Sequence, residues 1–481
     1  MNKNTQETKH PSFINRLFQS LSQSLKKGFS RLGKSFQRFY DRFRDGSTGT
    51  KVSHLVMGFG NLTRKQYAKG ILYLGLQIIF IFFMVSSPVV NSTPFGWKSL
   101  GNMITLGTEA GDLFNPTDNS MLMLLCGVVT VGLIAVFIIV YLSNIKSSYA
   151  TDLRLRKGKE PTTFKEDIAS LFDSRFHVLM LTPAMIGVLI FTVLPTIFMI
   201  LIAFTNFDSD HIPGQHLIDW VGFANFAAVF SGTGEIAVRF VPVLTWTLTW
   251  AFFATFTNYI AGILLALLIN RKQIKFKKMW RTIFILTIAL PQFISLLAMR
   301  NLLSLYGPIN SALVNMGILE APIEFLGLAT SATTARITIL VINLWVGIPY
   351  TMLMTSGILM NVPADLYEAA QIDGATRRQA FFNITVPYIL FVTAPYLITS
   401  FIGNITSFNI IFLLTGGDPV VPGYKAGQTD LLVTWLYSLT IEESDVSIGS
   451  VIAIFTFILT ATATLISYRR SKSYKEEDAF Q

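Results

Sequence analysis

The sequence predicts an all-α polytopic membrane protein with eight transmembrane helices. Of the 481 residues, 51% are apolar and only 14% are charged, whereas soluble domains carry about 25% charged residues. The mean hydropathy is +0.51. Several apolar runs reach about 20 residues, the length at which a helix crosses a hydrocarbon layer about 30 Å thick. These observations exclude an ordinary soluble enzyme.

The eight predicted spans contain no charged side chain. They are residues 70–90, 121–143, 178–204, 244–270, 282–299, 337–360, 387–404 and 449–468. Lys and Arg alternate between the segments that separate them, with 33 on the side that holds both termini and 5 on the other, while acidic residues divide evenly. The positive-inside rule therefore predicts a multi-pass protein of the cell membrane with both termini cytoplasmic. The 361–386 loop holds only two arginines, so its side follows from the number of spans.

The spans offer no redox or titratable chemistry. The single cysteine, Cys126, falls within the second span, which excludes an internal disulfide and a cysteine metal cluster. No metal site is expected. All five histidines lie in the tail or the loops, so no titratable relay crosses the bilayer, and an ion-driven mechanism is disfavoured. A sodium site made of backbone carbonyls at a broken helix stays open.

Residues 1–69 form a basic tail ahead of the first apolar stretch, and no cleavable signal peptide is visible. Its apolar residues recur at steps of three and four: Phe18, Leu21, Leu25, Leu32, Phe36, Phe39 and Phe43. Basic residues lie between them: Lys26, Lys27, Arg31, Lys34, Arg38 and Arg42. This pattern predicts an amphipathic helix on the anionic inner leaflet. A solvated extension is the alternative.

The same tail contains GFSRLGKS, residues 28–35, which satisfies the phosphate-loop pattern. A nucleotide site also needs a strand before the loop and an acidic strand end further on. Amphipathic segments flank this stretch on both sides and membrane spans follow. We therefore expect no nucleotide site here.

Uncharged polar and aromatic residues occur within the predicted spans from 244 to 404: Trp246, Trp250, Asn258, Gln292, Asn343, Trp345, Tyr350 and Asn404. Amides donate to and accept from hydroxyl groups, and flat rings cover the apolar faces of a sugar. The set therefore suits a neutral, hydroxylated ligand. The alternative for each residue is a helix contact or an interface anchor.

Residues 361–387 predict two short helices between the sixth and seventh spans. Pro363 suits a first helical position, and Gly374 suits the helix end. A second helix is expected over 375–383, before Pro387 opens the seventh span. Such a pair could fit a groove of a partner protein. The alternative is a simple connecting loop.

This loop resembles the EAA signature of the membrane subunits of binding-protein-dependent ABC importers. The matching residues at the expected spacing are Glu368, Ala369, Ala370, Gly374, Ile384 and Pro387, with Val386 in place of the usual leucine. The resemblance implies that the loop docks on an ATPase subunit through Glu368, Ala369, Ala370, Asp373, Gly374 and Pro387. It also supplies the energy source that the spans lack.

The resemblance extends over about residues 240–470 and is similar to the larger membrane subunit of maltose/maltodextrin importers. The shared phrases are LPQFIS at 290–295, TTAR at 333–336, NLWVGIPY at 343–350 and TDLLV at 429–433. It implies a type I importer permease core at 178–468 with coupling loop 361–387, two additional helices within 70–150 and a cytoplasmic tail at 469–481.

The resemblance also implies a substrate site in the membrane. Asn343, Gly347, Tyr350 and Asn404 match positions that contact sugar in relatives, and Gln292 is expected to join them although relatives have serine there. Other departures are Ile288, Gly403 and Ser407, where relatives have tyrosine, phenylalanine and asparagine. The expected substrate is therefore maltose, maltodextrin or another neutral oligosaccharide.

The family implies the remaining partners. The chain itself would be no enzyme and hold no cofactor, because two partner ATPase subunits would bind ATP and Mg, and a second permease subunit would complete the pathway. The short outer loop at 205–243 lacks the large insert of some members, which implies a lipid-anchored sugar-binding protein of a single-membrane bacterium. An ion-coupled sugar transporter and a membrane scaffold without transport are the rival functions.

Overall fold

The computed structural model describes residues 33–108, 118–212, 216–271 and 273–470, together with Lys26 and Ser30. The chain divides into two compact units, with the boundary between Phe198 and Met199 and with residues 213–217 assigned to the first unit. Half of the phosphate-loop pattern and the apolar positions before residue 33 lie outside the described residues, as does the tail beyond 470. The predicted division of the chain at residue 178 stays a prediction.

The first unit begins with helical residues 33–45. Its further elements are α2 (Thr48–Val52), α3 (Phe59–Leu62), α4 (Tyr67–Ser86), the antiparallel strands β1 (Val89–Val90) and β2 (Thr93–Pro94), α5 (Trp97–Thr105), α6 (Ser120–Arg156), α7 (Phe164–Phe172), α8 (Phe176–Val188) and the π-helical turn η1 (Leu189–Val193). Helix α9 (Leu194–Ile202) continues η1 across the boundary between the units.

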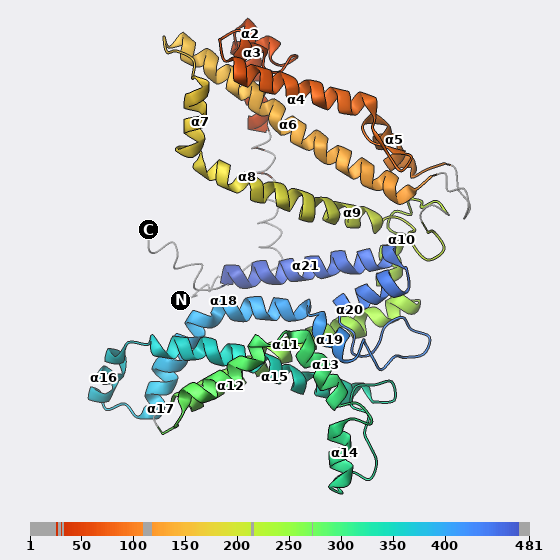
Figure 1. Ribbon diagram of the computed structural model, residues 1–481, viewed down its shortest axis with the longest axis vertical. Coiled ribbons are helices and arrows are strands. Elements are labelled where there is room, and N and C mark those ends of the chain that lie inside the picture. Colours follow the sequence, from red (N-terminus) through yellow and green to blue (C-terminus); the bar gives the residue numbers. More distant parts are fainter. Residues whose placement is uncertain are drawn as a thin grey trace, which may run out of the picture. The chain divides into compact units, whose positions relative to one another are not determined.

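The regular elements in the described part of the second unit are helices, joined by loops that contain two isolated β-bridges (Figure 1). Its elements are α10 (Ala224–Phe230), α11 (Glu235–Asn270), α12 (Lys277–Ala289), α13 (Gln292–Leu302), α14 (Pro308–Asn315), α15 (Ala332–Met360), α16 (Ala364–Ile372), α17 (Arg377–Ala380), η2 (Phe381–Thr385), α18 (Val386–Ile405), α19 (Asn409–Leu414), α20 (Leu432–Tyr437), η3 (Ser438–Glu442) and α21 (Val446–Arg470). Figure 1 shows α16 and α17 together at one end of this unit.

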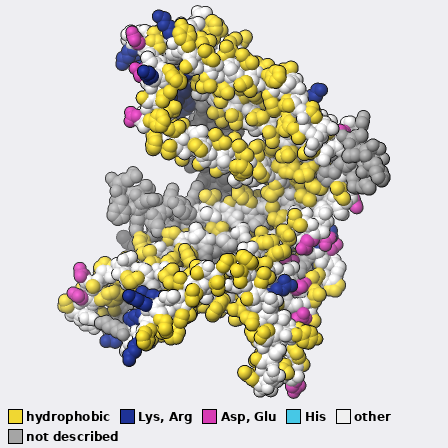
Figure 2. Space-filling model, in the orientation of Figure 1, with side chains coloured by type: hydrophobic (Ala, Val, Ile, Leu, Met, Phe, Trp, Pro, Cys, Tyr) yellow, Lys and Arg dark blue, Asp and Glu magenta, His cyan; other side chains and the backbone are white. Residues whose placement is uncertain are grey.

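The all-α fold and seven of the eight predicted spans are confirmed. Among the described residues, seven helices are long and apolar enough to cross a membrane, or eight if the bent pair α12 and α13 counts as one span. Helix α6 runs 13 residues beyond the predicted end at 143, and α11 begins nine residues before 244. The apolar run sets how much of a helix the bilayer can hold, but polar residues with good helix propensity continue the helix into water. Figure 2 shows hydrophobic side chains covering much of both units.

The fifth span differs from the prediction. Residues 282–299 were expected as one helix, but α12 and α13 meet at a bend of 93°. Pro291 lacks the N–H that would continue α12, and Leu290 before it adopts extended backbone, as the proline ring requires. The span is therefore broken near its middle.

The second helix of the 361–387 loop also differs. It begins at Arg377, not at 375, and continues through η2 into α18 without a break. Pro387 was expected to open a new helix, but the π-helical turn that precedes it accommodates the missing N–H. The turn η1 stands in the same relation to Pro195. The second helix of the 361–387 loop and the seventh span therefore form one continuous helix.

One contact in each unit shows which loops leave the same end of that unit. In the second unit, Nδ2 of Asn270 at the end of α11 donates to Oγ of Ser356 in the last turns of α15, at 3.2 Å. The basic loop after α11 and the 361–386 loop after α15 therefore leave the same end of this unit. In the first unit, Lys69 of α4 and Asp167 of α7 form an ion pair of 2.6 Å.

Candidate substrate cavity and coupling loop

The break between α12 and α13 lines a cavity of about 330 Å³. Its lining residues come from the two half-helices and from α15: Thr287, Ile288, Ala289, Leu290, Pro291, Gln292, Ser295, Trp345, Val346 and Tyr350. None of these ten is charged. The last turn of a helix leaves carbonyl groups without intrahelical donors, so the end of α12 adds backbone acceptors to the wall. The cavity can thus exchange hydrogen bonds with a neutral polar ligand.

Two of the five predicted substrate residues line this cavity. Gln292 is the first residue of α13 and is exposed, and Tyr350 projects from α15 with 51% of its surface exposed. The Tyr350 ring also lies 5.5 Å from the ring of Tyr396 of α18, at an interplanar angle of 31°. Trp345, 52% exposed, adds a third flat surface. An amide beside exposed rings is the combination that binds hydroxylated ligands.

The other two predicted substrate residues of α15 lie away from the cavity wall. Asn343 is buried, and its Nδ2 has no hydrogen-bond partner among the described residues. Gly347 packs against Asn258 of α11, where a Cβ atom would come within 2.1 Å of the Asn258 amide nitrogen. Gly347 is therefore required for the close approach of α11 and α15. The structure brings neither residue to the cavity that Gln292 and Tyr350 line.

Asn404 joins two helices. Its Nδ2 in α18 donates to Oγ1 of the buried Thr255 in α11, at 2.8 Å. This contact is the helix contact that the sequence left open as an alternative for such residues. The side-chain amide nitrogen of Asn404 therefore forms a hydrogen bond within the subunit.

The tryptophans of α11 belong to the core. Trp246 is 5% exposed, its Nε1 donates to the Thr429 carbonyl at 3.0 Å, and the Arg336 guanidinium lies 4.5 Å from its ring centre. Trp250 is fully buried in the same apolar cluster. The interpretation of these two rings as a sugar-stacking surface is therefore wrong, because both are covered by the subunit's own side chains.

The coupling loop presents the EAA residues on an exposed helix. Glu368 and Ala369 of α16 are exposed, and Ala370 is half-buried. The helix ends at Gly374 in the left-handed conformation (φ +75°), where the Gly374 N–H donates to Gln371 and the Ala375 N–H to Ala370. This pair of hydrogen bonds is the Schellman motif, which favours glycine at its left-handed position. The predicted end of the first helix is confirmed.

Tyr367 links the exposed helix to the span that follows it. Its hydroxyl forms a hydrogen bond of 2.8 Å with Oγ1 of Thr385, which is buried in η2. A cavity of about 280 Å³ lies between α16 and the start of the following helix. Sequence reasoning missed this contact, because the two residues are 18 positions apart and no local pattern pairs them.

A carboxylate in the loop before α20 was also missed. Asp430, within TDLLV, accepts hydrogen bonds from the Gly427 N–H and the Thr434 hydroxyl, each at 2.8 Å. Burial, with Glu442 and Asp418 nearby, raises the pKa of Asp430 from 3.8 to about 6. The carboxyl organises the loop that precedes α20. Its burial could not be read from an aspartate next to an apolar run.

Comparison with known proteins covers both the cavity and the loop. The family model described as binding-protein-dependent transport system inner membrane component matches residues 258–472. The maltodextrin transport system permease protein MalC of Streptococcus pneumoniae is 34% identical over 432 residues, which cover 88% of this chain and 96% of that protein. The galactooligosaccharides transport system permease protein GanP of Bacillus subtilis is 33% identical over 425 residues, 88% of this chain and 97% of that protein.

Among solved structures, the chain resembles a subunit of a bacterial ABC transporter involved in the import of the acidic polysaccharide alginate. The TM-score is 0.53 and the sequence identity 25%, over 64% of this chain and 99% of that chain.

Proposed function

The chain belongs to the binding-protein-dependent ABC transporter permeases, and we propose that it forms one half of a pathway importing a neutral oligosaccharide. As a permease subunit it is a multi-pass membrane protein and not itself an enzyme, and its family binds no cofactor. A second permease subunit, two ATPase subunits and a lipid-anchored sugar-binding protein would complete the complex. Family membership makes ATP hydrolysis in those partners the energy source, in place of an ion gradient.

The uncharged wall of the cavity carries the proposal. Every residue around it is neutral, while Gln292 and the exposed rings of Trp345 and Tyr350 supply hydrogen bonds and flat apolar surface. A buried carboxylate on the ligand would need a cationic partner to offset its desolvation, and the wall provides none. Among the substrates named for the similar proteins, the neutral maltodextrins and galactooligosaccharides therefore fit better than an acidic polysaccharide.

The coupling loop would transmit the work of ATP hydrolysis. We assign docking on an ATPase subunit to Glu368, Ala369, Ala370, Asp373 and Gly374, since α16 exposes its small residues where another backbone could approach. Movement of α16 would reach the seventh span directly, because the chain is helical from Arg377 to Ile405 and includes Pro387. The Tyr367 hydrogen bond braces the other side of this connection.

Uptake into proteoliposomes tests the substrate assignment. The complete complex, with its sugar-binding protein and ATP, is supplied separately with maltodextrins, galactooligosaccharides and oligouronates. We expect one of the neutral classes to be imported and Gln292→Ala and Tyr350→Ala each to lower the rate about tenfold or less, in line with the loss of one or two hydrogen bonds. Tyr306→Ala, at a residue 86% exposed and away from the cavity, is the control. Import of oligouronates alone would refute the neutral class.

Copurification tests the coupling loop separately. The tagged chain is extracted gently from its native membrane, with Gly374→Asp beside it. We expect a second permease and an ATPase with the unaltered chain, and less ATPase with the variant, because a side chain at φ +75° distorts the turn that presents α16. Equal ATPase recovery together with normal uptake would reject the coupling assignment while leaving the cavity assignment untouched.

A further inference from the structure

We infer that residues 33–66, here called the collar, lie in the interface of the cytoplasmic leaflet and bind anionic lipid headgroups. The collar precedes the first span and belongs to the first unit. It consists of the helical residues 33–45, then α2, α3 and their connections. Lipid binding by the collar does not depend on which sugar is imported or on the role of the 361–387 loop.

The depth of the collar follows from its contacts with two spans. Span side chains bond several backbone groups of the loop at 53–58. The Gln77 amide of α4 donates to the Leu55 carbonyl at 2.9 Å and accepts from the Met57 N–H at 2.7 Å. Gln77 lies seven residues inside the predicted start of its span, about 10 Å at 1.5 Å per residue, and its side chain leans back toward the cytoplasmic end. The loop therefore lies at the boundary of the hydrocarbon.

Helix α6 places the loop at the same level. The Tyr141 hydroxyl donates to the His54 carbonyl at 2.8 Å, and the Asn144 amide donates to the Ser53 carbonyl at 3.1 Å and accepts from the Gly58 N–H at 2.8 Å. Residues 141 and 144 straddle the predicted end of the span at 143. Satisfying backbone groups with protein side chains is what a segment needs where water is scarce.

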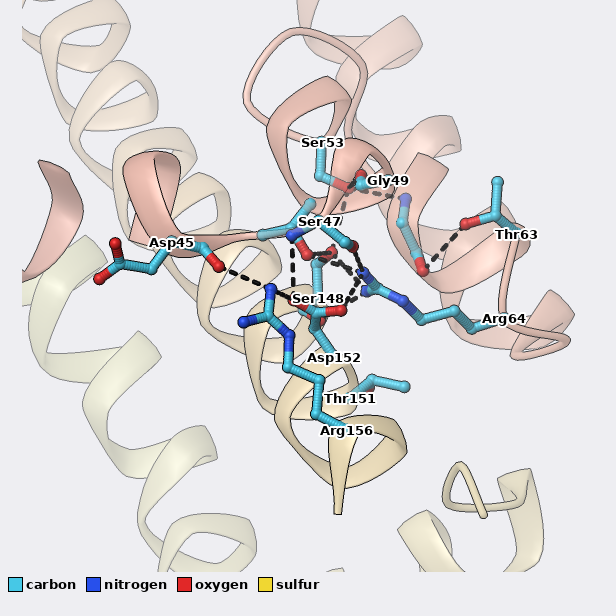
Figure 3. Close-up of polar contacts among 12 residues, drawn as sticks. Asp45, Ser47, Gly49, Ser53, Thr63, Arg64, Ser148, Thr151, Asp152 and Arg156 are labelled. Atoms are coloured by element: carbon cyan, nitrogen blue, oxygen red, sulfur yellow. Dashed lines mark hydrogen bonds and ion pairs between the residues drawn. The ribbon is translucent and has the colours of Figure 1, made fainter. Parts of the chain in front are cut away.

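A buried polar cluster fastens the collar to the cytoplasmic extension of α6 (Figure 3). Arg64 forms an ion pair with Asp152 at 3.3 Å, and both side chains are 7% exposed. The same guanidinium donates to the Ser148 carbonyl at 2.7 Å and to the Ser47 hydroxyl at 2.6 Å. Arg156 joins Asp152 to the Asp45 carbonyl. These contacts hold the middle and the end of the collar, at Asp45, Ser47 and Arg64, beside α6.

The helical residues 33–45 then present an aromatic face away from the protein. Phe39 packs on Tyr141 and, edge-on, on His54, with ring centres 6.4 and 5.2 Å apart. Phe36 and Tyr40 are 74% and 56% exposed. They lie one turn apart on the same side of the helix. Leu55, beside His54, is 82% exposed. Large apolar side chains gathered at a membrane boundary are best covered by acyl chains.

Basic side chains occupy the opposite face of the same helix. Lys34, Arg38 and Arg42 follow at steps of four and stand about half a turn from Tyr40. The ion pairs between described residues leave these three cations unneutralised, whereas Arg44 is paired with Asp41 and Asp45. Their charge complements the anionic lipids of the inner leaflet. Exposed aromatic side chains on one face of the helix and basic side chains on the other indicate that its partner is a lipid surface.

Nitroxide labels in the full complex test the inference. Cys126 is the only cysteine and is buried, so a Cys126→Ser background accepts single cysteines at Phe36 and Tyr40 on the aromatic face and at Ser35 on the basic face. The complexes are reconstituted in nanodiscs of phosphatidylcholine with and without phosphatidylglycerol. Power saturation compares the access of oxygen, which enters hydrocarbon, with that of a water-soluble nickel chelate.

We expect labels at 36 and 40 to favour oxygen and the label at 35 to favour nickel, with the contrast greater when phosphatidylglycerol is present. Replacing Lys34, Arg38 and Arg42 together by Glu should abolish the phosphatidylglycerol effect. Each basic residue strengthens binding of the helix to the anionic surface about fivefold, and three strengthen it about a hundredfold. Equal nickel access at all three positions in both lipids would overturn the inference. Protection of 36 and 40 only after the ATPase is added would identify a protein partner and overturn it as well.

Discussion

The burial of Asp430 predicts that the stability of the loop before α20 depends on pH. Its side chain is buried and its pKa rises from 3.8 to about 6, so folding favours the neutral form. The stability that this group contributes is fully present below about pH 4 and is lost as the pH rises to about 6. At 1.36 kcal/mol for each pH unit, the loss amounts to about 3 kcal/mol. Above that pH the carboxylate is ionised, and the hydrogen bonds that Gly427 and Thr434 donate to it stabilise the charge.

Asp430→Asn removes the titration and keeps the shape. The amide oxygen can accept from the Gly427 N–H, and the amide nitrogen can donate to the Thr434 oxygen, which already accepts from the Leu431 N–H and can donate to the Leu431 carbonyl. We therefore expect the variant loop to resist opening equally at pH 4.5 and 7.5. The unaltered loop should open more readily at the higher pH by about 2 kcal/mol, because about 1 kcal/mol of the total loss has already occurred at pH 4.5.

Hydrogen–deuterium exchange of peptides spanning 416–434 measures this opening directly in the assembled complex. Exchange rates are corrected for the intrinsic effect of pH, and peptides from α15 serve as the reference within each sample. The reasoning is refuted if the unaltered chain and the Asp430→Asn variant show the same change in protection between the two pH values. It is also refuted if the unaltered loop becomes better protected at pH 7.5, since that would mean the folded carboxyl prefers its ionised form.

Two further substitutions test the packing and the coupling. Gly347→Ala should destabilise the complex by about 1–3 kcal/mol in thermal unfolding, because its Cβ would overlap the side-chain amide of Asn258 on α11. Gly403→Ala has open space around it and should be neutral or slightly stabilising. An equal effect of the two would contradict the close approach at Gly347. Tyr367→Phe should lower the sugar imported per ATP hydrolysed, since it removes the hydrogen bond of about 0.5–1.5 kcal/mol to Thr385, and Thr385→Ser, which keeps a hydroxyl, should not. An unchanged ratio in Tyr367→Phe would show that the contact plays no part in coupling.

Local features of the sequence determined much of the architecture. The spans follow from runs of apolar residues whose length matches the bilayer. The end of α16 follows from Gly374 in the left-handed conformation, whereas Pro363, predicted at the first helical position, is the N-cap just before α16. The EAA spacing likewise identified the family, because it tests residue types at fixed separations. The break at Pro291 does not follow from the proline alone, because Pro183, Pro242, Pro349 and Pro395 lie inside unbroken helices. Its angle of 93° was likewise decided by the tertiary structure.

Tertiary packing decided which polar residues face the cavity. In a soluble helix the apolar stripe marks the buried side, but in a membrane the lipid-facing side is as apolar as the core, so the period of the sequence no longer distinguishes them. Trp250 and Tyr350 therefore look equivalent along the chain, yet one is fully buried and the other half exposed. The contacts of Tyr367 and Arg64 join residues far apart in the chain that only folding brings together. Asp430 bonds to near neighbours in the chain, but its burial depends on the tertiary packing around the loop.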